Sequence, residues 1–290
     1  MLGLLRSPPP PGTNTMTHSI ALLAAAALLG GAPAHRKPVA PPVVVVHAKD
    51  FSYVAPKSIK AGASTFHLVN DGKELHHLSI MKLAPGKTMA DFAAAMKKPG
   101  PPPAWVTNVG GPNAAVPGAS SDATLTLEPG NYVLLCFVPS PGETAPHVMK
   151  GMLHALTVVP GNSTAVEPAA DITVTLADYG FTVDKPLIAG HHEVKVVNTA
   201  AQTHEVVLME LMPGKTMADM GNWIEKELMK GPPPGRPIGG MSNLDKGRTG
   251  SFPVDLHPGH YGMICFVPDA KDGKPHSMHG MTKDFEVAAK

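Results

Sequence analysis

The sequence predicts an all-β protein made of two tandem Greek-key β-sandwich domains, each with a short inserted helix. Two observations carry this prediction. The chain repeats itself, and the apolar runs inside each repeat are short and bounded by clusters of Gly, Pro, Asn and Asp. The 32 Pro and 29 Gly among 290 residues also favour many short elements joined by turns. A hydrophobic fraction of 43% with only 16% charged residues excludes a disordered polyelectrolyte.

The repeat can be read directly from the sequence. Residues 85–91 (PGKTMAD) recur letter for letter at 213–219, and residues 129–139 match 258–268 with their Tyr and Cys in register. Other matching pairs are Val69-Asn70 with Val197-Asn198, and Asp50-Phe51 with Asp178-Tyr179. We therefore expect two homologous domains, at residues 41–160 and 171–288, joined by a small, polar linker at 161–170.

Within each repeat the apolar runs are typical of strands. In the first repeat we expect strands at residues 43–46, 65–69, 78–81, 124–127, 132–138 and 153–159. One segment departs from this pattern, because Met89, Phe92 and Met96 recur at helical spacing after a possible N-cap pair, Thr88 and Asp91. The second repeat has the same pattern, with Thr216, Asp219 and the face Met217, Met220, Trp223 and Ile224. We expect these Met side chains to pack in the core rather than to bind metal.

The N-terminus predicts an export signal. Residues 20–29 form a ten-residue apolar run that is followed by Ala32-Pro33-Ala34. Ten residues are too few to span a bilayer, which needs about 20. We interpret residues 1–34 as a signal peptide cleaved after Ala34, with Met1 or Met16 as the true start. The mature chain is then periplasmic or secreted, with no stable membrane span.

Charge and composition narrow the class of ligand. The formal net charge is +1, and no run of Lys or Arg offers a surface for nucleic acid. The chain is instead rich in residues that bind soft metals, with 15 His and 16 Met beside only 2 Cys. Composition therefore favours a metal-binding protein.

Each repeat ends in the same pattern of potential metal ligands. A Cys is followed by a His eleven residues later and by a Met five residues beyond that, and another His lies 60 or 61 residues upstream. One thiolate, two imidazoles and a thioether form the ligand set of a blue-copper site. We therefore expect two mononuclear copper sites, formed by His76, Cys136, His147 and Met152, and by His204, Cys265, His276 and Met281.

The Cys, His and Met residues could also have roles other than metal binding. A Cys136–Cys265 disulfide is disfavoured, since equivalent residues of tandem domains seldom face one another. Surface or strand-facing positions are expected for the unmatched residues His77, His154, His191, His192, His257, His260 and His279. Met149 and Met278 are repeated, and we expect them to pack beneath the ligand loop, with capture of Cu(I) as the alternative.

The pattern Pro-Gly-x-Tyr-x3-Cys, with His and then Gly-Met downstream, resembles the cupredoxin (blue, or type 1, copper) family, which includes plastocyanin and azurin. The long Cys-to-His segment is similar to the ligand loop of copper nitrite reductases. The resemblance implies that the first His lies on a strand and that Cys, His and Met lie on a loop. It also implies that electrons enter or leave at an apolar patch beside His147 and His276. One departure is that His77 and Glu205 stand where small cupredoxins often have Asn.

Three functional hypotheses follow. The leading one is an exported electron carrier with one type 1 copper per domain and a redox partner protein such as a cytochrome or an oxidase. The alternatives are a periplasmic copper-handling or resistance protein, and a copper-dependent reductase or oxidase formed by oligomerisation. Neither Cys136 nor Cys265 has a neighbouring His. The chain thus lacks the His-Cys-His motif of multicopper oxidases and the His-Cys motif of copper nitrite reductases, so we expect a carrier rather than an enzyme.

Overall fold

The computed structural model describes residues 3, 7–12, 39–97, 100 and 102–288. All the elements below lie in the compact unit Pro38–Lys290. The interpretation of residues 1–34 as a signal peptide falls almost entirely outside the described residues. In the part of the chain that is described, no helix is long and apolar enough to cross a membrane.

This compact unit is all-β with two short α-helices, which confirms the predicted fold class. The elements of the first repeat are β1 (Val43–Lys49), β2 (Ser52–Val54), β3 (Ser58–Lys60), β4 (Gly62–Asn70), β5 (Ser79–Leu83), α1 (Met89–Met96), β6 (Val106–Gly110), β7 (Ser120–Leu127), β8 (Gly130–Leu135), the 3₁₀ turn η1 (His147–Lys150) and β9 (Leu153–Val159). Those of the second are β10 (Ile172–Ala177), β11 (Gly180–Val183), β12 (Gly190–Asn198), β13 (His204–Leu211), α2 (Met217–Glu225), β14 (Gly235–Leu244), β15 (Thr249–Leu256), β16 (Gly259–Ile264), the 3₁₀ turn η2 (His276–His279) and β17 (Thr282–Val287).

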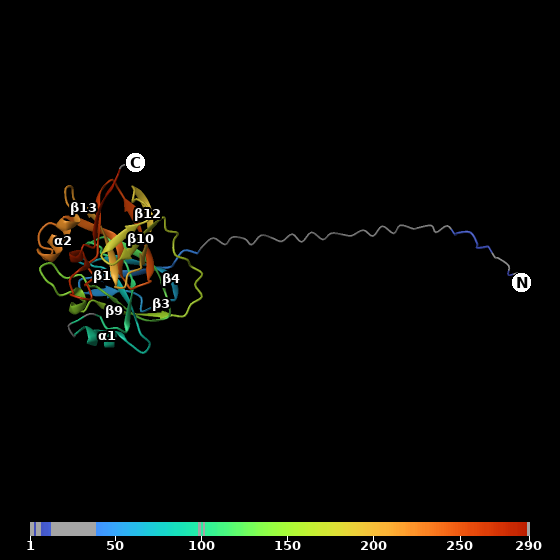
Figure 1. Cartoon of the computed structure of the whole chain (residues 1–290). Coiled ribbons are helices and arrows are strands. Elements are labelled where there is room, and N and C mark those ends of the chain that lie inside the picture. The colour runs from blue at the N-terminus through green and yellow to red at the C-terminus, as the bar shows by residue number, and fades with distance from the viewer. Residues whose placement is uncertain (1–2, 4–6, 13–38, 98–99, 101, 289–290) are drawn as a thin grey trace. The chain divides into compact units, whose positions relative to one another are not determined.

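Two sheets run through both repeats (Figure 1). One has the strand order β11-β10-β12-β15-β7-β4-β1-β2, and the other has the order β17-β16-β13-β14-β6-β5-β8-β9-β3. The first sheet takes four strands from each repeat, and the second takes five from the first repeat and four from the second. The two parts join where β15 meets β7 and where β14 meets β6. The domain boundaries at 41–160 and 171–288 stay a prediction, since the sheets are continuous across the two repeats.

The two repeats are related by a local two-fold axis. β15 is the equivalent of β7 at an offset of 129 residues, the offset from Cys136 to Cys265, and the two strands pair antiparallel. The equivalent strands β6 and β14 also pair antiparallel. Pro112 forms a bridge with Met241, the residue at the equivalent position of the second repeat, so the axis passes close to this pair. The repeats therefore meet through the same surface on each side.

The strands are longer or shorter than expected for local reasons. The run at 43–46 extends to Lys49 with alternating burial, because one face of β1 packs on the core. The run expected at 132–138 stops at Leu135, where the chain leaves the sheet and Cys136 begins the ligand loop. The three short strands that the apolar pattern did not predict are β2, β3 and β6.

The two helices begin where the sequence predicts. Thr88 and Thr216 are the N-caps, and each forms a complete capping box with the Asp three residues later. Met217 and Met220 are buried, as expected for core packing. Met89 is the exception. It is 36% exposed because the buried face of the shorter α1 is centred on Phe92.

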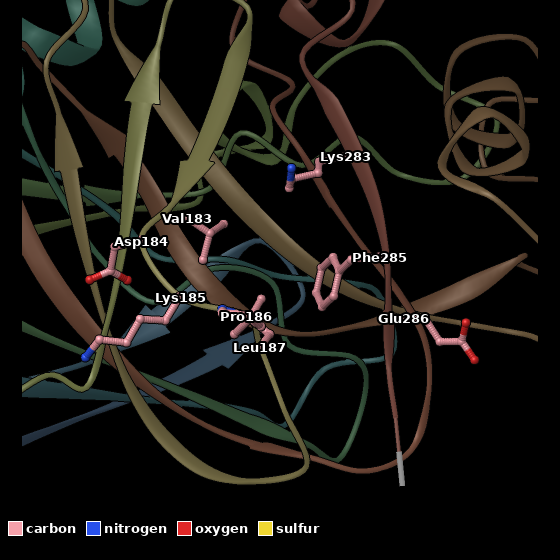
Figure 2. Close-up of a pocket in the computed structure, with 8 residues that line it drawn as sticks. All are labelled: Val183, Asp184, Lys185, Pro186, Leu187, Lys283, Phe285 and Glu286. Atoms are coloured by element: carbon pink, nitrogen blue, oxygen red, sulfur yellow. The ribbon is translucent and has the colours of Figure 1, made fainter.

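A surface pocket lies between the segment 183–187 and strand β17 (Figure 2). Its lining includes charged side chains, among them Asp184 and Lys283, but no Cys, His or Met. The pocket is therefore separate from the residues that form the candidate metal centres, which are buried in the protein interior.

Candidate metal centres

The structure brings His76, Cys136 and His147 together, and we refer to them as site 1. The Cys136 Sγ lies 3.5 Å from His147 Nδ1 and 4.0 Å from His76 Nδ1, and the two Nδ1 atoms are 3.1 Å apart. All three side chains are fully buried. Cys136 directly follows β8, and His147 is the first residue of η1. His76 lies between β4 and β5 and forms a single bridge with Ala115, so it is not on a strand as the resemblance implied.

The second repeat contains an equivalent cluster, His204, Cys265 and His276, which we call site 2. The Cys265 Sγ lies 3.5 Å from His276 Nδ1 and 3.9 Å from His204 Nδ1. All three side chains are again fully buried. Here the first His does lie on a strand, since His204 begins β13. In both sites the three possible ligand atoms lie within 4.8 Å of one another.

The first His of each site is oriented by an Asp in the turn after the first strand of its repeat. Asp50 Oδ1 lies 3.1 Å from His76 Nε2, and Asp178 Oδ1 lies 3.0 Å from His204 Nε2. A proton on Nε2 that is donated to the carboxylate leaves Nδ1 with a free lone pair turned toward the Cys. No Asn follows either of these His residues in this chain, so the first His is oriented by Asp50 or Asp178 instead.

The turn that carries the first His is fixed by a buried Asn. Asn70 Nδ2 donates to the carbonyls of Glu74 and Ala115 at 2.8 Å each. The equivalent Asn198 donates to the carbonyls of Gln202 and Leu244 at 2.8 and 2.6 Å. These bonds tie the turn to the strand beside it, so the position of the imidazole is set by the fold.

The second His differs between the sites. His147 Nε2 is 2.9 Å from Glu74 Oε2 and 3.3 Å from Ser140 Oγ. Its Nε2 proton is therefore bound by the carboxylate, which again leaves Nδ1 free. In site 2 the residue equivalent to Glu74 is Gln202, and His276 Nε2 has no hydrogen-bond partner among the described residues. The nearest carboxylate oxygen, on Asp269, is 3.7 Å away.

Both second His residues are covered by an aromatic ring, although the resemblance implied that electrons enter or leave beside them. Phe51 packs edge-on against His147 with ring centroids 5.1 Å apart, and Tyr179 packs on His276 at 5.5 Å. His147 and His276 consequently have no exposed surface. Phe51 and Tyr179 both have positive φ, at 64° and 62°, because they lie in the tight turn beside Asp50 and Asp178.

The predicted thioether ligands lie beside the sites, but their role stays a prediction. Met152 and Met281 are fully buried, and their N–H groups donate to the carbonyls of His147 and His276 at 3.1 and 3.0 Å. The expectation for the other repeated pair is wrong. Met149 and Met278 are 52% and 54% exposed, because the third residue of each 3₁₀ turn points outward while the first points inward.

One of the unmatched His residues is not where we expected it, because His77 is buried and lies outside the strands. His192 is also buried, but it lies on strand β12, in keeping with a strand-facing position. The His192 ring bridges Asp171 at 2.7 Å and the carbonyl of Ile188 at 2.8 Å, so its role is structural. His77 lies at the interface between the repeats, as does the equivalent Glu205.

The electrostatics of both sites fit a bound cation. Burial raises the pKa of the Cys136 thiol to about 12 and that of the Cys265 thiol further, so a thiolate needs a positive charge beside it. Burial lowers the pKa of His147 and takes that of His276 to about 4, which keeps the imidazoles neutral and able to donate lone pairs. A buried thiol with two oriented, neutral imidazoles fits copper.

No family model matches the sequence, and no curated protein matches it. Among solved structures, auracyanin from the photosynthetic bacterium Roseiflexus castenholzii is 24% identical over 42% of this chain and 100% of its own, with a TM-score of 0.27. The blue copper protein auracyanin A of Chloroflexus aurantiacus is 20% identical over 41% and 99%, with a TM-score of 0.29. A copper nitrite reductase from Nitrosomonas europaea is 14% identical over 88% and 95%, with a TM-score of 0.25.

Several residues that build the sites were not recognised from the sequence. Asp50, Asp178 and Glu74 lie far from the ligand loop along the chain and meet it only through the fold. A signal existed for the first two, since Asp50-Phe51 recurs as Asp178-Tyr179. Glu74 had no such signal, because its equivalent is Gln202.

Proposed function

We propose that this chain is an exported blue-copper protein that holds one mononuclear type 1 copper ion per repeat and transfers electrons. The observation that supports it is the pair of buried clusters in which a thiol and two imidazole Nδ1 atoms face one another. Met152 and Met281 are the proposed thioether ligands. Copper bound there would supply one-electron chemistry, since thiolate and thioether suit Cu(I) and imidazole suits both oxidation states.

The protein residues prepare site 1 before metal binds. Asp50 and Glu74 hold the Nε2 protons of His76 and His147, so both Nδ1 atoms stay available for the metal. Phe51 covers His147 and keeps water away from it. The ligands come from separate elements that the sheets hold in place, so a change of charge at the metal requires little movement of the protein. Such rigidity favours electron transfer.

The role of carrier is favoured over that of an enzyme by the residues beside each Cys. Leu135 and Phe137 flank Cys136, and Ile264 and Phe266 flank Cys265. None of them can bind a second copper centre. Turnover of nitrite or of a phenolic substrate by the copper-loaded protein would contradict this part of the proposal and would favour a reductase or oxidase formed by oligomerisation.

The metal content tests the proposal directly. We expect two copper ions per mature chain and an intense visible band from thiolate-to-copper charge transfer. Cys136→Ser should remove one copper and its share of the band, and Cys265→Ser should remove the other, so each variant serves as the matched control for its partner. A chain that saturates with one copper, or a Cys136→Ser variant that keeps its full colour, would refute the two-site proposal.

A second candidate function, copper handling, is favoured by one observation. Met149 and Met278 expose thioethers on the two ligand loops, where they are placed to receive Cu(I) from solution or from another protein. Under this alternative the protein binds Cu(I) without colour and exchanges it readily. Slower copper uptake by the Met149→Leu and Met278→Leu variants, with unchanged spectra once loaded, would support it.

Export and a redox partner complete the proposal. N-terminal sequencing of the exported protein should find cleavage after Ala34; a chain that begins at Met1 or Met16 would contradict it. Arg6 is the only Lys, Arg, Asp or Glu in residues 1–34. Without this segment the chain has 23 basic residues (24 minus 1) and 23 acidic residues. Because this net charge is zero, we propose that the partner docks at the exposed side chain of Met149 or Met278 with little dependence on salt.

A further inference from the structure

A buried side chain, Asn113, connects site 1 with site 2. The residues that follow the first His of each site, His77 and Glu205, lie at the interface between the repeats, and each is 5% exposed. Asn113 lies between them and is 1% exposed. None of the three is a proposed ligand. Each of them nevertheless forms a hydrogen bond, either to a group next to a proposed ligand or to another of the three.

In the first repeat, His77 is bonded to the segment that carries Cys136. The N–H of Phe137 donates to His77 Nε2 at 2.8 Å, so the proton of the neutral ring lies on Nδ1. The carboxamide of Asn113 adjoins the His77 imidazole. Its oxygen accepts from the N–H of Ala114 at 2.7 Å, and its NH₂ group points to the second repeat, where it lies 3.2 Å from the carbonyl oxygen of Val206.

In the second repeat, Glu205 takes the place of His77. The N–H of Phe266 donates to Glu205 Oε1 at 3.1 Å, and Asn113 Nδ2 donates to Glu205 Oε2 at 3.2 Å. The N–H of Glu205 also points to Cys265 Sγ at 3.5 Å. Hydrogen bonds therefore join the residue beside Cys136 to His77, and join Asn113 through Glu205 to the residue beside Cys265. The two sets meet where Asn113 adjoins the His77 imidazole.

We infer that this bridge couples the two sites electronically, so that an electron held at one site reaches the other within the same molecule through His77, Asn113 and Glu205. The inference rests on the proposed function, because it requires a one-electron metal at both sites. The exchange is balanced in itself: one site is oxidised as the other is reduced, and no other reactant takes part. The chain then works as a two-electron unit rather than as two separate carriers.

A comparison of Asn113 with its equivalent in the second repeat shows which of its contacts a shorter side chain can also make. The equivalent of Asn113 is Ser242, and both donate to equivalent backbone carbonyls: Ser242 Oγ to Leu78 at 3.0 Å and Asn113 Nδ2 to Val206 at 3.2 Å. A Ser is therefore sufficient for the contact between the repeats. The longer carboxamide of Asn113 also reaches Glu205 Oε2 and the carbonyl oxygen of Met241, and it adjoins His77. Because no His adjoins either Cys, this bridge also replaces the route that such a His would offer.

The experiment compares Asn113→Ser with Ser242→Ala, both in a Met281→Leu background that makes the two copper bands distinct. Each copper-loaded protein receives a pulse of less than one electron per chain, and absorbance at the two bands is followed as the electrons redistribute. A phase whose rate does not depend on protein concentration reports exchange within the molecule. We expect Asn113→Ser to slow this phase by about tenfold or more, the lower end of what loss of an outer hydrogen-bond partner costs at metal sites. Ser242→Ala should leave it unchanged.

The outcomes separate the inference from the proposed function. If the protein lacks two copper ions or the charge-transfer bands, the proposed function fails, whatever Asn113 does. If both bands and both potentials are retained in Asn113→Ser and the concentration-independent phase keeps its rate, the bridge is not the path and the inference is overturned. Equal slowing by Ser242→Ala would also overturn it, because the effect would then come from the interface in general.

A measurement on the metal-free wild-type chain tests the bridge even if the variant fails to fold. In the nitrogen NMR spectrum we expect His77 to be neutral with its proton on Nδ1, and the side-chain amide protons of Asn113 to exchange slowly with solvent. A His77 proton on Nε2, or rapid exchange of the Asn113 amide protons, would break the chain of hydrogen bonds and overturn the inference.

Discussion

The buried carboxyl group of Glu205 should make the stability of the metal-free protein fall as the pH rises. The side chain accepts hydrogen bonds from the N–H of Phe266 and the amide of Asn113, and no Lys, Arg or His forms a salt bridge with it in the described residues. Burial raises its pKa from 4.5 to about 7. The folded protein therefore holds a proton on Glu205 over a range of pH in which the unfolded chain has lost it.

The sign and size of the effect follow from linkage. A raised pKa in the folded state stabilises the protein fully below pH 4.5, and this contribution is lost as the pH rises through about 7. The difference between the two pKa values corresponds to roughly 3 kcal/mol at 1.36 kcal/mol per pKa unit. His77 acts in the opposite direction, because burial lowers its pKa to about 3 and its stabilisation is lost as the pH falls. A comparison with a variant is needed to isolate Glu205.

Glu205→Gln provides that comparison. Urea unfolding of the metal-free wild type and variant is measured at intervals from pH 4.5 to 8, and the difference in unfolding free energy is plotted against pH. The single amide oxygen of Gln can accept from Phe266 N–H or from Asn113 but not from both, so the variant carries a constant penalty, but Gln does not titrate. We expect the advantage of the wild type to shrink by roughly 3 kcal/mol across this range. A difference that is flat, or that grows with pH, would refute the assignment of Glu205 as a carboxyl that is protonated by burial.

Two further predictions concern orientation and backbone conformation. Asp50→Asn keeps an acceptor for His76 but removes the charge, so copper affinity at site 1 should fall by about tenfold in chelator competition while site 2 is unchanged. Asp178→Asn should do the converse, and equal loss at both sites in either variant would contradict this assignment. Gly240→Ala should lower the unfolding free energy by about 3 kcal/mol, because its φ is +127° and its Cβ would lie 2.1 Å from the carbonyl oxygen of Val206. Gly247→Ala is the control, since its φ is also positive at +76° but nothing lies within 4 Å; an equal effect there would show that crowding at Gly240 is unimportant.

Much of the fold could be predicted because the relevant signals are local or repeated. The capping boxes at Thr88 and Thr216 depend on residues three positions apart, and the strands depend on alternating burial along short runs. The two Cys–His–His clusters could be predicted because the same spacing occurs twice while the sequence between has changed. A single occurrence of the spacing between Cys136 and His147 would have been much weaker evidence for a metal site.

The rest could not be predicted because it depends on contacts between distant parts of the chain. Nothing in the ligand loop indicates that Phe51 covers His147 or that Glu74 binds its Nε2 proton. His77 and Glu205 are misleading for the opposite reason. They are different residues at equivalent positions, a pattern that is typical of exposed positions under little constraint. Here both are buried, and they face each other through Asn113 across a two-fold axis.

The pairing of β7 with β15 and of β6 with β14 also has a consequence for the origin and assembly of the molecule. A single repeat would expose both of these edges, and such an edge is a template for adding another chain. Because each edge is complementary to its own copy, the natural product of two separate repeats is a closed homodimer, which stops growing at two. Fusing the copies through residues 161–170 makes that association independent of protein concentration. It also allowed the two halves to diverge, so that one interface could acquire an Asn on one side and a Ser on the other, which no homodimer can do.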